Sequence, residues 1–350
     1  MGMIEEYILE TPEKMKYIVE KAEELFSEVV KKEVNKIIIT GSGTSFHSGI
    51  QMADQMQKIM NIEVHAMYPF MINDETFIND SSKTLVIGIS QGGSSYSTYN
   101  AMKLAKANGC LTASMAGCKS AYIDEQADFI LTVYCGEELA GAKTKGYYCT
   151  KLNLLLFSLH YSLNNKLISE RQFEEKIEQI RDSISRFSGV HKAAAEWIDK
   201  NSEALKDSKE IRVTGPASLY GDVLESALKQ LETLRCPVTG YEFEEFIHGI
   251  YNAINENSTV FILDNGQESR SKKMKEVLST WSDNIYLISN KDKEADLYLP
   301  TTDYVDMETF NFIIPMQLIC DKIPTLRGVD PSAPKDPQFH MKLGSKKFNK

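Results

Sequence analysis

Short runs of β-branched and aliphatic residues alternate along the chain with longer segments whose apolar positions recur every three to four residues. The short runs predict strands and the longer segments predict helices, an order typical of α/β proteins with parallel sheets buried on both faces. In the first half, strands are predicted at residues 36–40, 62–66, 84–89, 110–115 and 129–134. A long helix at 145–167 follows, and then a charged helix at 169–187 that we interpret as a solvated connector.

The strand pattern returns after this connector. Strands are predicted at residues 210–214, 259–263, 284–288 and 296–299, with a helix at 218–234. Thr40 and Thr214 end the first strand of each half, and each lies 49 residues before the end of the next central strand. The shared period of 174 residues indicates a duplicated, doubly wound, flavodoxin-like domain. Ligands of such sheets bind at the carboxyl ends of the strands.

Two turns rich in glycine and hydroxylated residues follow predicted strands of the first half. Residues 41–45 (GSGTS) follow the first strand, and residues 90–95 (SQGGSS) follow the third. Both turns precede helices, so backbone N–H groups and hydroxyls gather where a helix dipole favours an anion. One such turn can simply connect a strand to a helix, but two at one sheet edge favour a phosphate site.

The corresponding turns of the second half are residues 215–218 (GPAS) and 264–267 (DNGQ). Asp264 places a negative charge where a phosphate would lie. We therefore expect the second half to have lost phosphate binding and to serve another role.

Length, charge and cysteine content narrow the function classes. A chain of 350 residues favours two domains. The formal net charge of −10 argues against nucleic acid or an anionic membrane as a partner, but not against a small anion bound by backbone amides.

The six cysteines form no C-x-x-C pair, and we interpret them as reduced core thiols. The histidines do not have the spacing of zinc ligands. We expect a cytoplasmic protein with no signal peptide, cofactor or metal.

These motifs are similar to those of the sugar isomerase (SIS) domain family, above all to the isomerase half of glucosamine-6-phosphate synthase and to fructosamine-6-phosphate deglycases. The resemblance runs from about residue 20 to the end of the chain. It rests on GSGTSFHS (41–48), LVIGISQGGSS (85–95), ELAGAKTK (138–145), VLESALKQLE (223–232) and LICDK (318–322) followed by GVDP (328–331). It implies two tandem SIS domains, residues 20–168 and 190–328, with a tail at 329–350 that closes the site.

The resemblance also implies which residues hold the phosphate of a sugar phosphate. They are Gly43, Thr44, Ser45, Ser90, Gln91, Gly92 and Ser95. Gly92 stands where the family usually has serine, which removes one hydroxyl contact. The glutaminase domain of the synthase has no counterpart here, so we expect no synthesis of glucosamine-6-phosphate from glutamine.

Isomerisation of a sugar phosphate moves a proton between C1 and C2 and needs an acid/base to open the ring. The resemblance implies Glu232 as the proton shuttle, with Glu225 supporting the ligand contact from the same helix. It implies His248, 16 residues after Glu232, as the ring-opening group, supplied by the neighbouring subunit of a homodimer. From the residues alone, the two glutamates could instead form an exposed acidic edge, and His248 could cap a helix or lie in the core.

In the synthase, a lysine of the C-terminal tail forms a Schiff base with the open-chain ketose. Lys342 is the nearest candidate, Lys346 and Lys347 compete with it, and plain surface charge is the alternative for each. His340 and His47 are weaker candidate ligand contacts.

Together these inferences favour a phosphosugar isomerase-type enzyme that acts on a 6-phosphorylated ketose or amino sugar through an enediol or enolamine. A fructosamine-6-phosphate deglycase is an alternative, because both reactions begin with the same proton transfer. A non-catalytic phosphosugar sensor is the alternative from another class, although such proteins usually carry one SIS domain fused to a DNA-binding domain.

Overall fold

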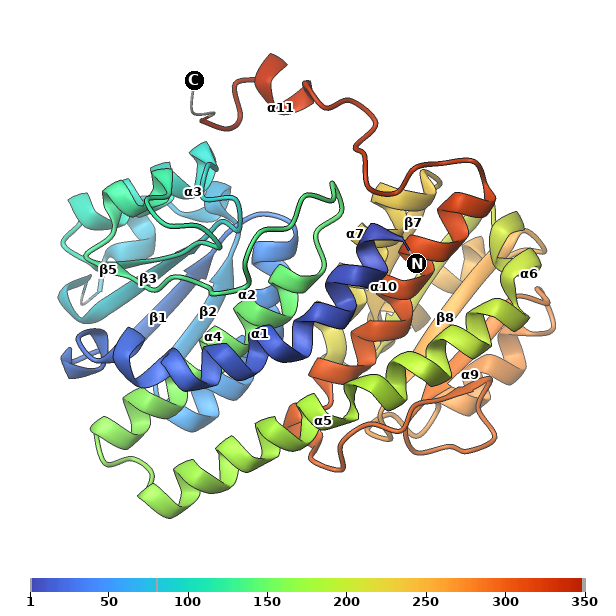
Figure 1. Cartoon of the computed structure of the whole chain (residues 1–350), viewed down its shortest axis with the longest axis horizontal. Coiled ribbons are helices and arrows are strands. Elements are labelled where there is room, and N and C mark those ends of the chain that lie inside the picture. The colour runs from blue at the N-terminus through green and yellow to red at the C-terminus, as the bar shows by residue number, and fades with distance from the viewer. Residues whose placement is uncertain (1, 80, 348–350) are drawn as a thin grey trace. The chain divides into compact units, whose positions relative to one another are not determined.

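Two five-stranded parallel sheets form the framework of the computed structural model, which describes residues 2–79 and 81–347 (Figure 1). The first sheet has the order β2-β1-β3-β4-β5, and the second has the order β7-β6-β8-β9-β10 when read from the corresponding edge. This is the flavodoxin-like order, so the predicted α/β fold of two doubly wound domains is confirmed. The strands are β1 (Lys36–Thr40), β2 (Glu63–Met67), β3 (Thr84–Ile89), β4 (Leu111–Met115), β5 (Phe129–Ile130), β6 (Glu210–Gly215), β7 (Val238–Glu242), β8 (Ser258–Asp264), β9 (Ile285–Ser289) and β10 (Leu297–Tyr298).

The strand register shows the duplication directly. Lys36 of β1 lies opposite Thr84 of β3, and Glu210 of β6 lies opposite Ser258 of β8. Both residues of the second pair lie 174 positions after their counterparts in the first. The predicted period of 174 residues therefore relates two strand pairs, β1–β3 and β6–β8, that are paired in the same register.

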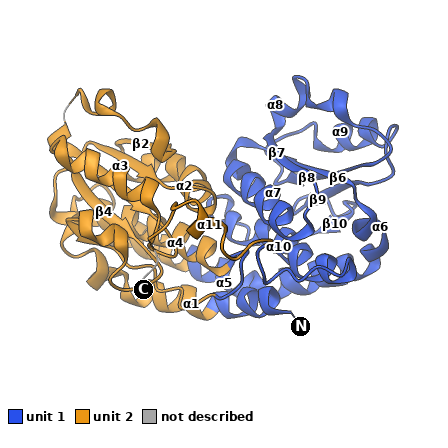
Figure 2. Cartoon of the chain, turned by 90° about the horizontal axis from the view of Figure 1, so that it is seen from above, with its two compact units in different colours: residues 1–12, 139–144, 179–334 blue, residues 13–138, 145–178, 335–350 orange. Residues whose placement is uncertain are grey.

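The chain divides into two compact units, each built around one sheet (Figure 2). Unit 2 comprises residues 13–138, 145–178 and 335–350, and contains the first sheet. Unit 1 comprises residues 1–12, 139–144 and 179–334, and contains the second sheet. Residues 335–350 of the C-terminal tail are thus grouped with the first sheet, whereas residues 329–334 and the short segment 139–144 are grouped with the second.

Helices connect and cover the strands, as a parallel sheet requires. Helix α4 is buried along nearly its whole length and packs against α2, so it forms part of the core rather than an amphipathic cover. No helix in the described ranges is long and apolar enough to cross a membrane. The helices are α1 (Met3–Phe26), α2 (Thr44–Met60), α3 (Tyr96–Ala107), α4 (Lys145–Asn164), α5 (Glu170–Lys200), α6 (Ser202–Asp207), α7 (Tyr220–Leu234), α8 (Phe243–Ile247), α9 (Ser271–Leu278), α10 (Thr309–Leu326) and α11 (Phe339–Lys342).

Three elements differ from the sequence prediction. Strand β7 is unpredicted, because VTGYE has no apolar run; it lies at a sheet edge and pairs only with β6. Strand β5 is shorter than predicted, although Leu131 and Val133 still donate backbone hydrogen bonds to the β4 side. Helix α5 extends to Lys200 and buries Ile180 and Phe187, so it is amphipathic rather than a solvated connector.

The cysteines are all free thiols, but they are not all in the core. Cys110, Cys135, Cys149 and Cys320 are buried, and burial raises the pKa of Cys320 to about 12. Cys118 is exposed, so the prediction of core thiols is wrong for that residue, which follows β4 in a loop.

His160 on α4 makes the stability of the protein sensitive to acid. Its ring lies against Phe26 and Phe173, and burial lowers its pKa from 6.5 to about 4. The unfolded chain then binds a proton more readily than the folded chain, so stability present above pH 6.5 is lost as the pH falls toward 4. The loss attributable to this group is on the order of 3 kcal/mol. Urea unfolding should show a flatter pH dependence between pH 6.5 and 4 for His160→Phe than for the wild type, and an identical dependence would contradict this assignment.

Candidate functional site

The turn after β1 brings the N-terminus of α2 to the carboxyl edge of the first sheet. Gly43 caps the helix with φ 56° and ψ −129°, a conformation that favours glycine. A Cβ atom on Gly41 would lie 2.8 Å from the carbonyl oxygen of Ile89, so this turn passes very close to the end of β3. Thr44 and Ser45 occupy the first turn of α2, where backbone N–H groups lack helical partners and attract anions.

The turn after β3 has the same construction. Gly93 has φ 68° and donates its N–H to the carbonyl of Ser90. Ser95 is the N-cap of α3, and its Oγ accepts hydrogen bonds from the backbone N–H and the hydroxyl of Thr98 at 3.3 and 3.1 Å. Because β1 and β3 are neighbours, two helix N-termini and several hydroxyls meet where the strand order reverses, which is where doubly wound sheets bind ligands.

The side chain of Gln91 has a contact that the sequence did not predict. Its Nε2 donates to Glu138 Oε2 at 2.8 Å, and Glu138 also accepts the backbone N–H groups of Lys145 and Gly146 at the start of α4. Glu138 is only 4% exposed, and a Cβ atom on Gly146 would collide with the Gln91 amide. Gln91 therefore braces the turn against α4. Glu138 belongs to a recognised motif, but its role could not be inferred without knowing this contact.

The C-terminal tail pairs with the second turn. Ser95 and Lys346 form an antiparallel bridge, Tyr96 N–H donates to Ser345 O, and Lys347 N–H donates to Ser94 O. The Lys347 ammonium lies 4.3 Å from the centre of the Tyr122 ring.

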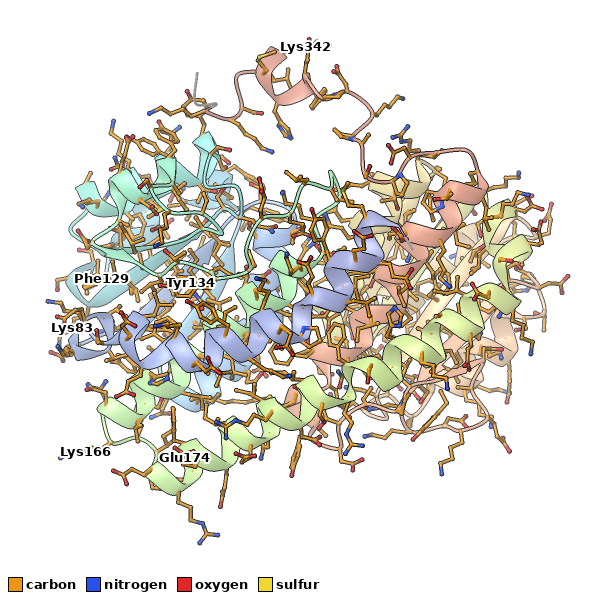
Figure 3. The ribbon with its side chains drawn as sticks, in the orientation of Figure 1. Lys83, Phe129, Tyr134, Lys166, Glu174 and Lys342 are labelled. Atoms are coloured by element: carbon orange, nitrogen blue, oxygen red, sulfur yellow. The ribbon has the colours of Figure 1, made fainter. Side chains whose placement is uncertain are left out.

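Of the tail lysines, Lys342 is solvent-facing. Its side chain is 58% exposed, and its Nζ lies 2.7 Å from Asp336 Oδ2 (Figure 3). His340 bonds through Nδ1 to Ser345 Oγ, and burial lowers its pKa. His47 is 7% exposed and lies beside Phe46.

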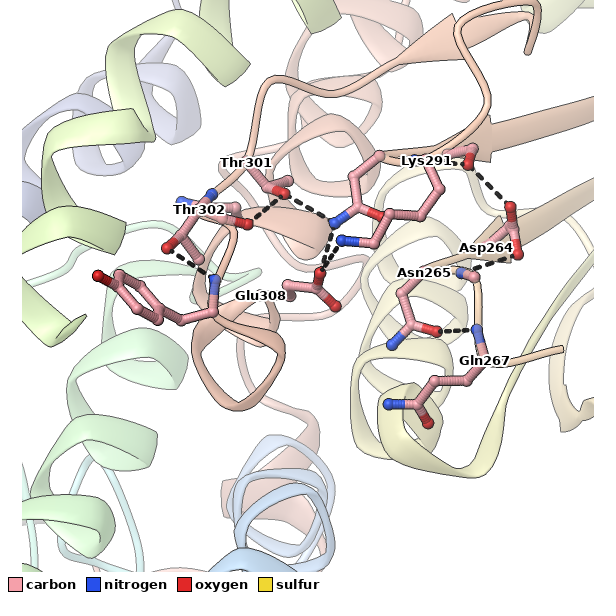
Figure 4. Close-up of polar contacts among 12 residues, drawn as sticks. Asp264, Asn265, Gln267, Lys291, Thr301, Thr302 and Glu308 are labelled. Atoms are coloured by element: carbon pink, nitrogen blue, oxygen red, sulfur yellow. Dashed lines mark hydrogen bonds and ion pairs between the residues drawn. The ribbon is translucent and has the colours of Figure 1, made fainter. Parts of the chain in front are cut away.

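In the second sheet, side chains of the chain itself occupy the equivalent turn (Figure 4). Asp264 stands 174 residues after Ser90, and its carboxylate accepts the N–H of Gly266 and the hydroxyl of Ser289. The stem of Lys291 lies over Gly266, since a Cβ there would be 2.8 Å from Lys291 Cγ. Its ammonium reaches the buried Glu308 at 2.8 Å. The Asp264 carboxylate and the stem of Lys291 thus lie at the turn that is equivalent to residues 90–95.

Glu225 and Glu232 lie on α7 in unit 1, together with a lysine that sequence reasoning missed. Lys229 is 3% exposed; its Nζ lies 2.6 Å from Glu232 Oε2 and 3.8 Å from Glu225 Oε1. Glu225 is fully buried, whereas the Glu232 side chain is 35% exposed. Leu231, which precedes Glu232, is exposed. The sequence did carry a signal for this cluster. Lys229 lies four residues after Glu225 and three residues before Glu232, and these spacings place the three side chains on one face of a helix.

His248 ends α8 and is exposed, so it does not lie in the core. Its Nδ1 lies 2.7 Å from the carbonyl oxygen of Glu244, an acceptor, so Nδ1 carries a proton. In the neutral ring, Nε2 then presents its lone pair to solvent and can act as a base. The described residues contain no group of three or more His, Cys, Asp and Glu side chains that could hold a metal ion.

Comparison with known proteins agrees with this architecture. The model of the family described as SIS domain matches residues 32–158. A crystal structure from Clostridium difficile 630, named provisionally as a phosphosugar isomerase, is 59% identical, covers 100% of both chains and has a TM-score of 0.97. A structure from Salmonella typhimurium LT2, named provisionally as a sugar-binding protein, is 41% identical, covers 91% of this chain and 99% of its own, and has a TM-score of 0.84.

More distant relatives point in the same direction. Glutamine–fructose-6-phosphate aminotransferase (isomerizing) of Thermococcus kodakarensis is 26% identical over 346 residues, which cover 94% of this chain and 56% of that enzyme. The chain spans about half the length of the curated relatives that it matches. With its two equivalent sheets and the match across its whole length, the chain belongs to the SIS-domain family, as a protein with two such domains in tandem.

Proposed function

We propose that this protein is a phosphosugar isomerase-type enzyme that acts on a 6-phosphorylated ketose or amino sugar. The observation that carries the proposal is the pair of hydroxyl-rich turns, residues 41–45 and 90–95, at adjacent strand ends and helix N-termini. Such a pair can bind a phosphate dianion without a net positive charge. The 59% identity to a structure named as a phosphosugar isomerase supports the same substrate class.

In the proposed reaction, His248 and Glu232 share the proton transfers. His248 Nε2 takes the proton of the anomeric hydroxyl and returns one to the ring oxygen, which opens the ring. Glu232 then removes a proton from C1 of the open-chain ketose, giving an enediolate; a proton passes from O1 to O2, and Glu232 returns its proton to C2, giving the aldose. Lys229 orients the Glu232 carboxylate through its 2.6 Å contact. In a homodimer, His248 would come from the second copy.

The substrate class is tested with a panel of 6-phosphorylated ketoses, aldoses, amino sugars and fructosamines in D₂O. We expect one substrate to be converted with one deuterium incorporated at C1 or C2, detected by mass spectrometry and NMR. Release of a free amine from a fructosamine would identify a deglycase instead. Phosphosugar binding without conversion of any compound would contradict the enzyme proposal and favour a sensor.

The phosphate turn is tested by giving the first half the residue that the second half has at the equivalent position. Ser90→Asp should raise KM about 100-fold with a much smaller effect on kcat, because a carboxylate repels the phosphate and occupies its donors. Asn100→Asp, which adds the same charge at an exposed position further along α3, is the matched control. Equal KM values for the two variants would place the phosphate elsewhere.

A site shared between two copies makes a quantitative prediction. Glu232→Gln and His248→Ala should each lose nearly all activity when assayed alone. When the two variants are refolded together, half of the random pairs contain one chain of each kind, and one of the two sites in such a pair is intact. The mixture should therefore recover about a quarter of the wild-type activity. No recovery, with mixed pairs demonstrated by mass spectrometry, would mean that both residues act within one chain.

A further inference from the structure

Helix α8, which ends at His248, is too short to hold its own orientation. It comprises only Phe243–Ile247. The Glu242 carboxylate accepts the N–H groups of Glu244 and Glu245 at 2.7 and 3.2 Å, which caps the helix at its start. A helix of this length has too few internal hydrogen bonds to offset the cost of nucleation, so contacts with the rest of unit 1 must set its orientation.

Arg270 makes such a contact, through a carboxylate and a ring of α8. Its guanidinium donates to Glu244 Oε1 and lies 5.2 Å from the centre of the Phe243 ring. The same guanidinium donates to both carboxylate oxygens of Glu268, at 2.8 and 2.7 Å, and this hydrogen bonding lowers the pKa of Glu268. A bidentate pair fixes the plane of the guanidinium, and with it the direction from which Arg270 meets Glu244.

The segment that carries Arg270 joins β8 to α9 and is held by its own side chains. It begins with the turn that is equivalent to residues 90–95, where Asp264 Oδ1 accepts the N–H of Gly266 at 3.1 Å (Figure 4). It ends where the Arg270 N–H donates to Glu268 Oε1 at 2.9 Å, directly before α9. The turn of the second sheet therefore leads to a cation whose backbone and side chain are both fixed.

Glu244 connects this cation to the histidine. Arg270 binds its carboxylate, and its carbonyl oxygen accepts the Nδ1–H of His248 at 2.7 Å. A tilt of α8 would move both ends of Glu244 and weaken the bond to the ring. That bond decides which tautomer the neutral imidazole adopts, and hence whether Nε2 carries the lone pair.

We propose that Arg270 is a positioning residue for His248. By fixing α8, it lets the Glu244 carbonyl keep the proton of the neutral ring on Nδ1 and leaves Nε2 as the base. The inference rests on the proposed function, in which His248 opens the sugar ring, and it gives the turn of the second sheet a role in the same reaction.

The clamp should act on geometry more than on stability. The side chains of Arg270 and Glu244 are each about half exposed, and exposed ion pairs contribute little to the free energy of unfolding. Lys273 offers a matched control, because it is an exposed cation of α9 that pairs at 2.9 Å with Glu276 of its own helix. Arg270→Met and Lys273→Met thus remove the same charge from neighbouring positions, but only the first removes the contact with α8.

Nitrogen NMR of the full chain labelled with ¹⁵N-histidine tests the clamp without a substrate. His248→Gln identifies the signals of the ring. At alkaline pH, where imidazole is neutral, we expect the Nδ1–H tautomer in the wild type and in Lys273→Met, and a shift toward the Nε2–H tautomer in Arg270→Met. Arg270→Lys should also shift, because an ammonium keeps the charge but lacks the planar fork. An unchanged tautomer in Arg270→Met, or an equal change in Lys273→Met, would overturn the proposal.

Exchange between the anomers of a 6-phosphorylated ketose gives a kinetic measurement. Glu232→Gln should still open the ring in the proposed reaction. Adding Arg270→Met to it should slow the exchange about tenfold, a part of the factor of about 10²–10⁴ that an acid–base group contributes, and adding Lys273→Met should not. Equal rates in the two double variants would count against the clamp. A tautomer shift in a protein that opens no sugar ring would refute the proposed function alone.

Discussion

Glu232→Gln should lower kcat by a factor of about 10²–10⁴ and leave phosphosugar binding nearly unchanged, because general acid–base catalysis contributes that range. The amide keeps the size of the side chain, but it cannot take up a proton from carbon. In the proposed function, phosphate binding belongs to the turns of the first sheet and does not use this group. The measurements are kcat in a steady-state assay and Kd by calorimetry.

A separate isotope measurement makes this prediction sharper. Ring opening by His248 should persist in Glu232→Gln, whereas incorporation of deuterium at C1 or C2 from D₂O should disappear with kcat. Glu245→Gln is a suitable control, because Glu245 is an exposed glutamate on α8 that has no proposed role in the proton transfer. Turnover of Glu232→Gln at the wild-type rate would show that another residue shuttles the proton.

Lys229→Met should destabilise the fold by about 3–5 kcal/mol, because it removes a buried cation and leaves the fully buried Glu225 facing an apolar side chain. The expected measurement is a lower urea midpoint at pH 7. Activity should also fall, since Glu232 loses its 2.6 Å contact.

The double variant Lys229→Met, Glu225→Gln separates these two effects. Neutralising Glu225 should recover much of the stability, because a neutral amide costs less to bury than a carboxylate that has lost its contact with Lys229. The value of kcat should stay low, because Glu232 still lacks the Lys229 ammonium. If kcat returned together with stability, Lys229 would serve the fold alone.

The central strands and the glycine-rich turns at 41–45 and 90–95 were predictable from the sequence, because both depend on local patterns. A fully buried parallel strand reads as an apolar run, and β3 and β8 are buried at every position. The turn at 41–45 was recognisable because glycine is needed at Gly43 for its positive φ. The family resemblance added the positions of Glu232 and His248, which no local pattern singles out.

Features that depend on contacts distant in the sequence were not predictable. Glu138 lies 47 residues from Gln91, and only the fold reveals that one braces the other. Helix α7 buries charged side chains, whereas an amphipathic helix normally buries its apolar face. The buried charges of Glu225 and Lys229 lie 3.8 Å apart and stabilise each other in place of solvent. Edge strand β7 carries little apolar signal, because it is paired on one side only.

The turn of the second sheet carries a side chain that the first sheet cannot accommodate. Lys291 stands 174 residues after Gly117, where a Cβ atom would lie 2.9 Å from Cys135 Sγ and 3.1 Å from Gln91 O. The first half therefore has no room for the side chain that occupies the second. In the second half, the ammonium of Lys291 pairs with Glu308, so this repeat ties the loop after β9 to the start of α10 with its own residues. Steric exclusion at Gly117 thus separates two repeats that share one topology and one period.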